Sequence, residues 1–303
     1  MSAKELILDC KGLLNATDGE RTGVSRRTAL QAVVGVGYAA AAGTVVAQTA
    51  IKTSTEGLTA GEIVIDVNGF KMSAYRAAPA GKTKLPVVLV VSEVFGVHEY
   101  IADICRRFAK LGYLAIAPEL YQRQGEPMSY NVIADLMREV VSKVSDAQVM
   151  GDLDACVAWA TANGGDAKRI AVTGYCWGGR MTWLYAAHSK SIKAAVAWYG
   201  RLVDSTPTAL ALAPKNPIDL VDNLNAPVLG LYGRTDASIP MESLALMQNK
   251  LKDSKNKAAK ACEFVTYDNT PHAFHADYRA TFRKEAAEDG WEQAKIWFKQ
   301  HGV

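Results

Sequence analysis

The sequence lacks the features that mark disulfide-rich, metal-binding or nucleic-acid-binding proteins. Its five cysteines form no CxxC pair and show no metal-type spacing with the five histidines, so neither a disulfide framework nor a metal site is expected. The 34 basic and 31 acidic residues leave a net charge of only +3, which argues against nucleic acid as a partner. Nucleotide and flavin motifs are absent from the sequence, and we expect no cofactor.

The first fifty residues have the pattern of an export signal. Residues 25–31 (SRRTALQ) form a twin-arginine pattern, and residues 32–47 are apolar and rich in Ala, Val and Gly. This stretch is short for a membrane span, which needs about 20 apolar residues, and it ends in a plausible cleavage site before Gln48. We therefore expect no stable membrane anchor.

Residues 1–51 are thus predicted to be a signal and leader that engages the twin-arginine export machinery. The protein would then be periplasmic or exported. Charges before the arginine pair nearly cancel, so the alternative is a disordered or amphipathic extension of a cytoplasmic protein.

From residue 62 onward, strand-like and helix-like segments alternate. A hairpin over residues 62–76 is predicted to turn at Asn68-Gly69. Further strands are predicted at residues 86–92, 113–117, 169–174, 194–199, 227–232 and 263–267, and helices at residues 98–111, 130–143, 147–162, 177–188, 241–251 and 278–300. This alternation predicts a single α/β domain over residues 52–303, with a mostly parallel sheet flanked by helices on both faces. Residues 201–225 are predicted to form a loop or lid.

Residues 174–179 (GYCWGG) fit the pattern G-x-S-x-G with Cys176 in place of serine. Only glycine fits two residues before and after a nucleophile on so tight a strand-to-helix turn. The helix N-terminus would favour the reactive thiolate, and the N–H of Trp177 could point at a developing oxyanion. The alternative is that Cys176 is a small core residue and the glycines only pack a strand against a helix.

A candidate acid and a candidate base each follow a later predicted strand. Asp236 and His272 come after Cys176 in the order that α/β-hydrolases use for nucleophile, acid and base, so we predict that fold. His272 would move the proton and Asp236 would orient the imidazole. His275 and Asp277 are nearby alternatives, but neither follows its strand as directly.

Several further short segments follow predicted strands. Glu93 opens the segment EVFGV directly after an apolar strand. It is joined by GYCWGG at residues 174–179, WYG at 198–200, GRTD at 233–236 and HAF at 272–274. Together these segments resemble the dienelactone hydrolase family (carboxymethylenebutenolidases), and the resemblance covers roughly residues 60–300 and keeps the expected order throughout.

The resemblance implies a catalytic triad of Cys176 with the acid and the base described above. Glu93 matches a family glutamate that helps to generate the thiolate when substrate binds. The N–H groups of Val94 and Trp177 would form the oxyanion hole. The implied reaction is hydrolysis of a small ester or enol-lactone through an acyl-cysteine intermediate.

The sequence departs from the family pattern where substrate binds. Lactonases of the family carry an arginine four residues past the histidine, and here that position is Ala276. Arg279 follows three residues later, and Arg138 lies in the region of a second substrate arginine. The full set of candidate substrate contacts is Arg138, Tyr121, Tyr199, Phe274 and Arg279.

Two other functions stay open. A broad carboxylesterase or thioesterase would use the same fold and the same cysteine. A catalytically idle binding protein is the second alternative, although such a copy would be expected to lose a triad residue or one of the tight glycines.

Overall fold

The computed structural model describes residues 50–203 and 212–303. The predicted export signal lies outside these residues, as does part of the predicted lid. Within the described ranges, no helix is long and apolar enough to cross a membrane.

The described strands form one eight-stranded sheet with the order β1-β2-β4-β3-β5-β6-β7-β8. β1 and β2 form an antiparallel hairpin, β2 pairs antiparallel with β4, and all later pairings are parallel. The bounds are β1 Leu58–Val67, β2 Phe70–Pro79, β3 Leu85–Val91, β4 Leu114–Pro118, β5 Gly165–Tyr175, β6 Ala194–Trp198, β7 Val228–Gly233 and β8 Glu263–Tyr267. The predicted hairpin turn is confirmed, with positive φ at Asn68 and Gly69.

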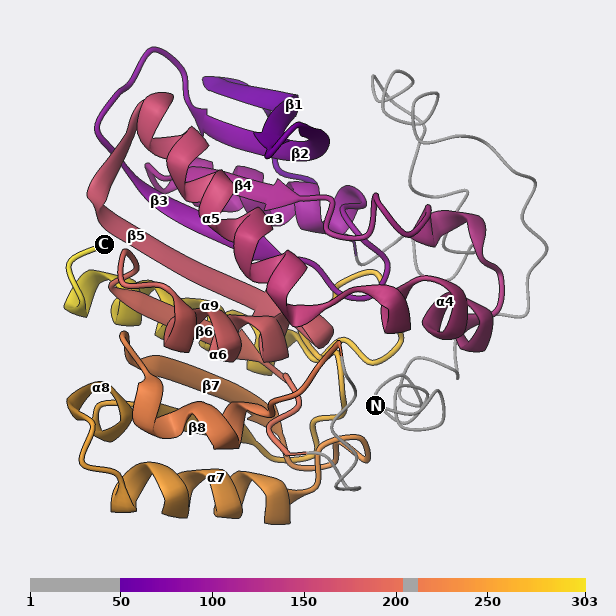
Figure 1. The fold of residues 1–303 in the computed structure, drawn as a ribbon, viewed down its shortest axis with the longest axis vertical. Coiled ribbons are helices and arrows are strands. Elements are labelled where there is room, and N and C mark those ends of the chain that lie inside the picture. Colours follow the sequence, from indigo (N-terminus) through magenta and orange to yellow (C-terminus); the bar gives the residue numbers. More distant parts are fainter. Residues whose placement is uncertain (1–49, 204–211) are drawn as a thin grey trace.

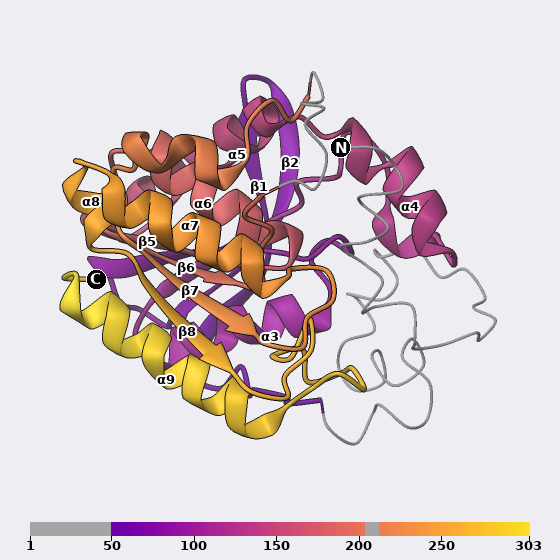
Figure 2. The ribbon, with the colours of Figure 1, turned by 90° about the horizontal axis from the view of Figure 1, so that it is seen from below.

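Helices cover both faces of this sheet, as the alternating pattern predicted. Figure 2 shows α5, α6 and α7 on one face and α3 and α9 on the other, while α4 lies outside both layers (Figure 1). The bounds are α3 Glu99–Lys110, α4 Ile133–Glu139, α5 Asp146–Ala162, α6 Trp177–His188, α7 Met241–Asp253, α8 Lys257–Lys260 and α9 Lys284–Gln300. The central strands carry apolar runs such as LPVVLVV in β3, because helices bury them on both sides.

Two predicted helices are shorter than expected. The helix predicted over residues 130–143 is confirmed only for α4, because the 3-10 turn Pro127–Ser129 leaves Tyr130 extended and the backbone breaks again at Val140. The helix predicted from residue 278 begins at Lys284. Before it, successive i to i+3 bonds form a series of turns, including Ala276 N–H to Ala273 O at 3.0 Å.

The loop predicted over residues 201–225 contains a 3-10 helix, η4 Pro217–Asn223. The Asn216 N–H donates to the Asp219 carboxylate at 2.8 Å, and Pro217 occupies the first helical position. Alternating patterns could not reveal so short an element.

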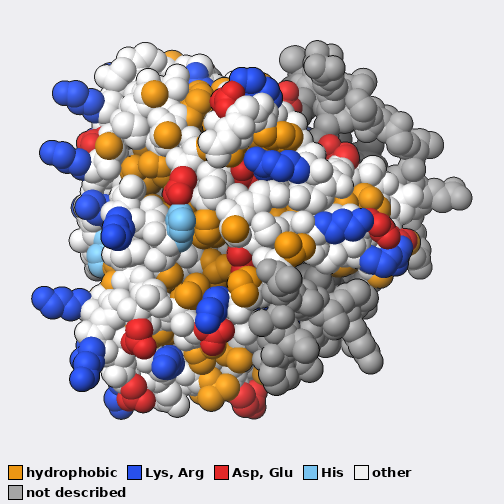
Figure 3. All heavy atoms as spheres, viewed as in Figure 1, with side chains coloured by type: hydrophobic (Ala, Val, Ile, Leu, Met, Phe, Trp, Pro, Cys, Tyr) orange, Lys and Arg blue, Asp and Glu red, His pale blue; other side chains and the backbone are white. Residues whose placement is uncertain are grey.

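Basic and acidic side chains are interspersed on the face of the molecule in Figure 3. That face shows no broad basic surface. This distribution agrees with the small net charge of +3.

Candidate active site

Cys176 occupies the turn between β5 and α6, where its backbone adopts φ 56° and ψ −116°. A side-chain-bearing residue rarely takes this conformation, and it is the strained turn expected of a nucleophile. The Cys176 N–H donates to the backbone oxygen of Trp198 at 3.0 Å, which ties the turn to β6. The side chain is buried, at 2% exposure.

The glycines around Cys176 are required by close backbone approaches. A Cβ on Gly174 would overlap the backbone oxygen of Gly178, and one on Gly178 would overlap that of Val91 in β3. A Cβ on Gly179 would lie 2.6 Å from the backbone oxygen of Trp198. These contacts give a physical reason for the glycine pattern that the sequence showed.

Asp236 and His272 form a buried pair at the same edge of the sheet. Asp236 follows β7, His272 follows β8, and the Asp236 Oδ2 lies 2.7 Å from the His272 Nδ1. The Ser238 N–H also donates to the Asp236 carboxylate at 2.8 Å. Burial would raise the pKa of Asp236, but the charge and hydrogen bond of His272 outweigh it and lower that pKa below its usual value.

The two loops that carry this pair are joined by their backbones. The N–H of Thr235 donates to the backbone oxygen of Thr270 at 3.1 Å, and the N–H of Arg234 donates to that of Tyr267 at 2.9 Å. A Cβ on Gly233 would overlap the backbone oxygen of Thr270. This close packing fixes the separation of Asp236 from His272.

The other side of the imidazole interacts with Cys176. Burial alone would lower the pKa of His272, but the charges of Asp236 and Cys176, with hydrogen bonds to both, raise that pKa well above its usual value. The Nε2 atom is buried, and no described residue forms a hydrogen bond of ordinary geometry with it. Asp236 and Cys176 therefore both act on His272, and a catalytic triad of these three residues stays a prediction.

His275 and Asp277, the alternatives to the acid and the base, face other partners. The Nδ1 of His275 lies 2.7 Å from the Tyr100 hydroxyl, and burial lowers the pKa of His275 well below its usual value. Asp277 pairs with Arg107 at 2.5 Å. Both residues hold α3 against the loop that follows β8.

Glu93 is fully buried just after β3. Its Oε2 accepts from the Tyr278 hydroxyl at 2.9 Å and lies 3.3 Å from the His98 Nε2. Burial would raise the pKa of Glu93, but His98, the charge of Arg279 and Tyr278 outweigh it and lower that pKa. Sequence reasoning missed His98 and Tyr278, although His98 lies only five residues after Glu93 and Tyr278 adjoins Arg279.

The proposed oxyanion donors lie at the ends of neighbouring strands. Val94 is buried after β3, and Trp177 is the first residue of α6. First-turn N–H groups such as that of Trp177 have no acceptor within their own helix, so this group can bind an anion.

Four of the five candidate substrate residues lie around the site. The rings of Tyr121 and Trp177 are 4.9 Å apart, and those of Tyr199 and His272 are 5.1 Å apart. Phe274 is buried against Tyr199 at 5.3 Å.

The two candidate arginines lie in different environments. Arg279 is buried, and its Nε donates to the Tyr278 hydroxyl at 3.0 Å, which in turn donates to Glu93 at 2.9 Å, so Arg279 reaches the site despite its shifted position. Arg138 instead lies exposed on α4, paired with Asp135 and Glu139, and within the described part of the chain no hydrogen bond or ion pair joins it to Cys176, Asp236 or His272. The prediction that Arg138 binds substrate gains no support from its position.

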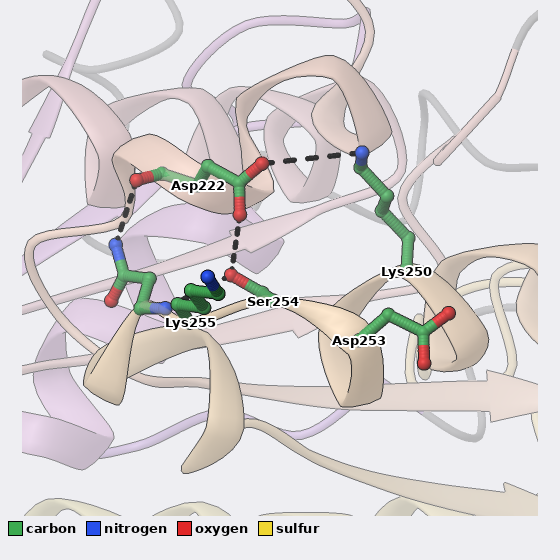
Figure 4. A pocket seen from close by; sticks show the side chains of 6 residues that line it. Asp222, Lys250, Asp253, Ser254 and Lys255 are labelled. Carbon is green, nitrogen blue, oxygen red and sulfur yellow. Dashed lines mark hydrogen bonds and ion pairs between the residues drawn. The ribbon is translucent and has the colours of Figure 1, made fainter.

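A surface pocket lies apart from these residues, between η4 and the end of α7 (Figure 4). The Asp222 carboxylate accepts from Ser254 at 2.5 Å and lies 4.0 Å from the Lys250 Nζ. Asn256 donates to the backbone oxygen of Asp222 at 3.0 Å. These contacts join the two helices and do not form a catalytic arrangement. In the described part of the chain, no cluster of three or more His, Cys, Asp or Glu could hold a metal.

Fold and site together define an α/β-hydrolase. The model of the dienelactone hydrolase family matches residues 72–302, so the chain belongs to that family. The predictions of this family, this fold and an ester-bond hydrolase are confirmed.

Relatives with known sequences or structures agree with this assignment. A protein of Methylorubrum extorquens named "Putative carboxymethylenebutenolidase" is 51% identical over 284 residues, which is 93% of this chain and 95% of its own. An Escherichia coli K12 protein of the same name is 49% identical over 267 residues, 88% and 96% of the two chains. A crystal structure described as "Putative Dienelactone Hydrolase", from Klebsiella pneumoniae, shares 52% identity with a TM-score of 0.77, covering 80% of this chain and 99% of that one.

Proposed function

We propose that the protein is a cysteine-dependent hydrolase of small esters or enol-lactones that acts through an acyl-cysteine intermediate. The observation that carries this proposal is the buried Asp236–His272 pair, which interacts with Cys176 on the strained turn at the start of α6. A structural cysteine would need neither the strained backbone nor the paired imidazole.

The reaction would begin with attack of the Cys176 thiolate on the substrate carbonyl carbon. The N–H groups of Val94 and Trp177 would stabilise the oxyanion. The tetrahedral adduct then collapses, the leaving oxygen takes a proton from the imidazolium form of His272, which its raised pKa favours, and a thioester remains on the sulfur. The neutral His272 next removes a proton from water, which attacks the thioester and releases the carboxylic acid and the Cys176 thiolate.

The substrate depends on the groups that surround Cys176. The two relatives reported above carry the name "Putative carboxymethylenebutenolidase", which favours an enol-lactone. Ala276 removes one expected contact with a substrate carboxylate, while Arg279 supplies a buried cation nearby. A broad carboxylesterase or thioesterase is the second candidate, because the aromatic lining of Tyr121, Tyr199 and Phe274 would accept uncharged acyl groups.

Hydrolysis measurements on the Cys176→Ala variant test the proposal. We expect loss of esterase and lactonase activity, and a covalent acyl adduct on Cys176 in the wild type when a slow ester is trapped and digested for mass spectrometry. A lactone bearing a carboxylate, compared with an aryl ester and a thioester, would identify the preferred class. Full activity of Cys176→Ala would show that another residue is the nucleophile.

We also propose that residues 1–51 direct export by the twin-arginine route. The pattern at residues 25–31 and the apolar stretch after it support this proposal. Replacing Arg26 and Arg27 by lysine should retain the full-length protein inside the cell. Equal export of the lysine variant, measured by fractionation and N-terminal sequencing, would contradict the proposal.

A further inference from the structure

Glu93 and Cys176 occupy equivalent positions on neighbouring strands. β3 and β5 are adjacent and parallel, and Val91 is in register with Gly174. Glu93 and Cys176 each lie two residues beyond this pair, so both leave the sheet at the same point. Burial would lower the pKa of Arg279, but Tyr278 and the charges of Glu93 and Cys176 outweigh it and raise that pKa.

The contacts of Glu93 are distributed unequally between its two carboxylate oxygens. The Tyr278 hydroxyl donates to Oε2, and the His98 Nε2 lies against the same oxygen. Oε1 is buried and has no hydrogen-bond partner among the described residues. A buried acceptor without a partner is costly, so its presence calls for a reason.

Tyr278 also joins Glu93 to Arg279. The described part of the chain contains no ion pair within 4 Å between Arg279 and Glu93, and instead the Arg279 Nε donates to the Tyr278 hydroxyl at 3.0 Å. The guanidinium lies 5.0 Å from the centres of the Phe95 and Tyr278 rings. The Tyr278 hydroxyl therefore accepts from a cation and donates to an anion, and both interactions fix its orientation.

The family resemblance already gives Glu93 the role of generating the Cys176 thiolate. We propose that Tyr278 and His98 are positioning residues for this step, which hold Glu93 by Oε2 and so leave Oε1 to accept the thiol proton. In this step the S–H bond breaks, an O–H bond forms on Oε1, and a thiolate remains on Cys176. The inference rests on the proposed cysteine mechanism. It gives Tyr278 a role in acylation alone, because the acyl-cysteine carries no thiol proton.

Single-turnover kinetics with p-nitrophenyl acetate separate this role from direct substrate binding. In Tyr278→Phe the acylation rate constant should fall about 10- to 100-fold, as expected when a charged buried acceptor loses a hydrogen bond. The deacylation rate constant and KM should change less than about twofold. A direct substrate contact would instead raise KM and leave the acylation rate constant at saturation unchanged.

A double-mutant cycle with Glu93→Gln tests whether Tyr278 acts through Glu93. In the Glu93→Gln background, the further change Tyr278→Phe should lower the acylation rate constant only slightly. His98→Gln, which keeps an N–H donor, should retain more activity than His98→Leu. Tyr113→Phe is the matched control, because it removes a partly buried hydroxyl that donates to the backbone oxygen of Val303 at 3.3 Å, away from the site.

Two results would overturn the inference while leaving the cysteine mechanism intact. The first is an acylation rate constant in Tyr278→Phe equal to that of the wild type. The second is a double variant in which the losses of acylation rate caused by Tyr278→Phe and Glu93→Gln multiply, as independent effects do. Each of these results overturns the inference alone when the Cys176→Ala variant is inactive. Full activity of Cys176→Ala would instead overturn the proposed function and this inference together.

Discussion

The Asp236 Oδ2 lies 2.7 Å from the His272 Nδ1, although 36 residues separate them in the chain. A second His–Asp pair, His188 with Asp154, has a similar separation of 2.8 Å but is exposed. Distance alone therefore does not distinguish a catalytic pair. Burial and the neighbouring thiol set the Asp236–His272 pair apart.

Asp236→Asn should lower kcat/KM by about 10²- to 10⁴-fold, because an amide no longer stabilises the imidazolium or fixes the tautomer of His272. Steady-state ester hydrolysis measures this effect. The matched control is Asp154→Asn at the exposed pair, which should leave kcat/KM unchanged. Equal losses in the two variants would contradict a catalytic role for Asp236.

The stability contributed by the Asp236–His272 pair should depend on pH. The pKa of Asp236 is lowered on folding, so its contribution is present above the ordinary value of 3.8 and is lost as pH falls through the folded pKa. The pKa of His272 is raised, so its contribution is fully present below 6.5 and is lost as pH rises through the folded pKa.

The two contributions therefore overlap most fully between about pH 4 and pH 6.5. Denaturant unfolding of the wild type and of an Asp236→Asn/His272→Gln double variant should show the largest difference in this window. A difference that stays constant from pH 3 to pH 9 would show that the pair does not titrate as described.

Gly178→Ala should destabilise the fold by about 3 kcal/mol or more, because its Cβ would overlap the backbone oxygen of Val91, which cannot move aside cheaply. Chemical denaturation measures the free energy of unfolding. Gly151→Ala in α5 is the control, since a Cβ there meets no atom within 4 Å, and it should be neutral or stabilise by up to about 1 kcal/mol. Similar results for the two glycines would refute the packing argument.

Asp146→Ala should cost about 3–5 kcal/mol, because it leaves Arg180 buried without its carboxylate partner. Arg180 donates to both Asp146 oxygens, at 2.7 and 2.9 Å. Asp135→Ala breaks the exposed pair with Arg138 and should leave the free energy of unfolding nearly unchanged. Thermal and denaturant unfolding of the two variants measures both effects. Equal stability of Asp146→Ala and Asp135→Ala would contradict the stabilising role of the buried Asp146–Arg180 pair.

The sequence by itself determined the fold class and the candidate triad. Continuous apolar strands alternating with helices allow few arrangements, and a cysteine between two glycines at a strand-to-helix turn is locally specified. Cys176, Asp236 and His272 each follow a predicted strand, and in a parallel sheet this places all three at the carboxyl ends of the strands. Local pattern was enough because each residue follows the strand that positions it.

Only the tertiary structure decided which side chains meet around that triad. The bond from Tyr278 to Glu93 spans 185 residues, and the helix predicted from residue 278 gave way to turns that bring Tyr278 and Arg279 inward. Arg138, predicted as a substrate contact, instead lies exposed with partners on its own helix. These outcomes depend on side-chain directions in loops, which hydrophobic periodicity does not encode.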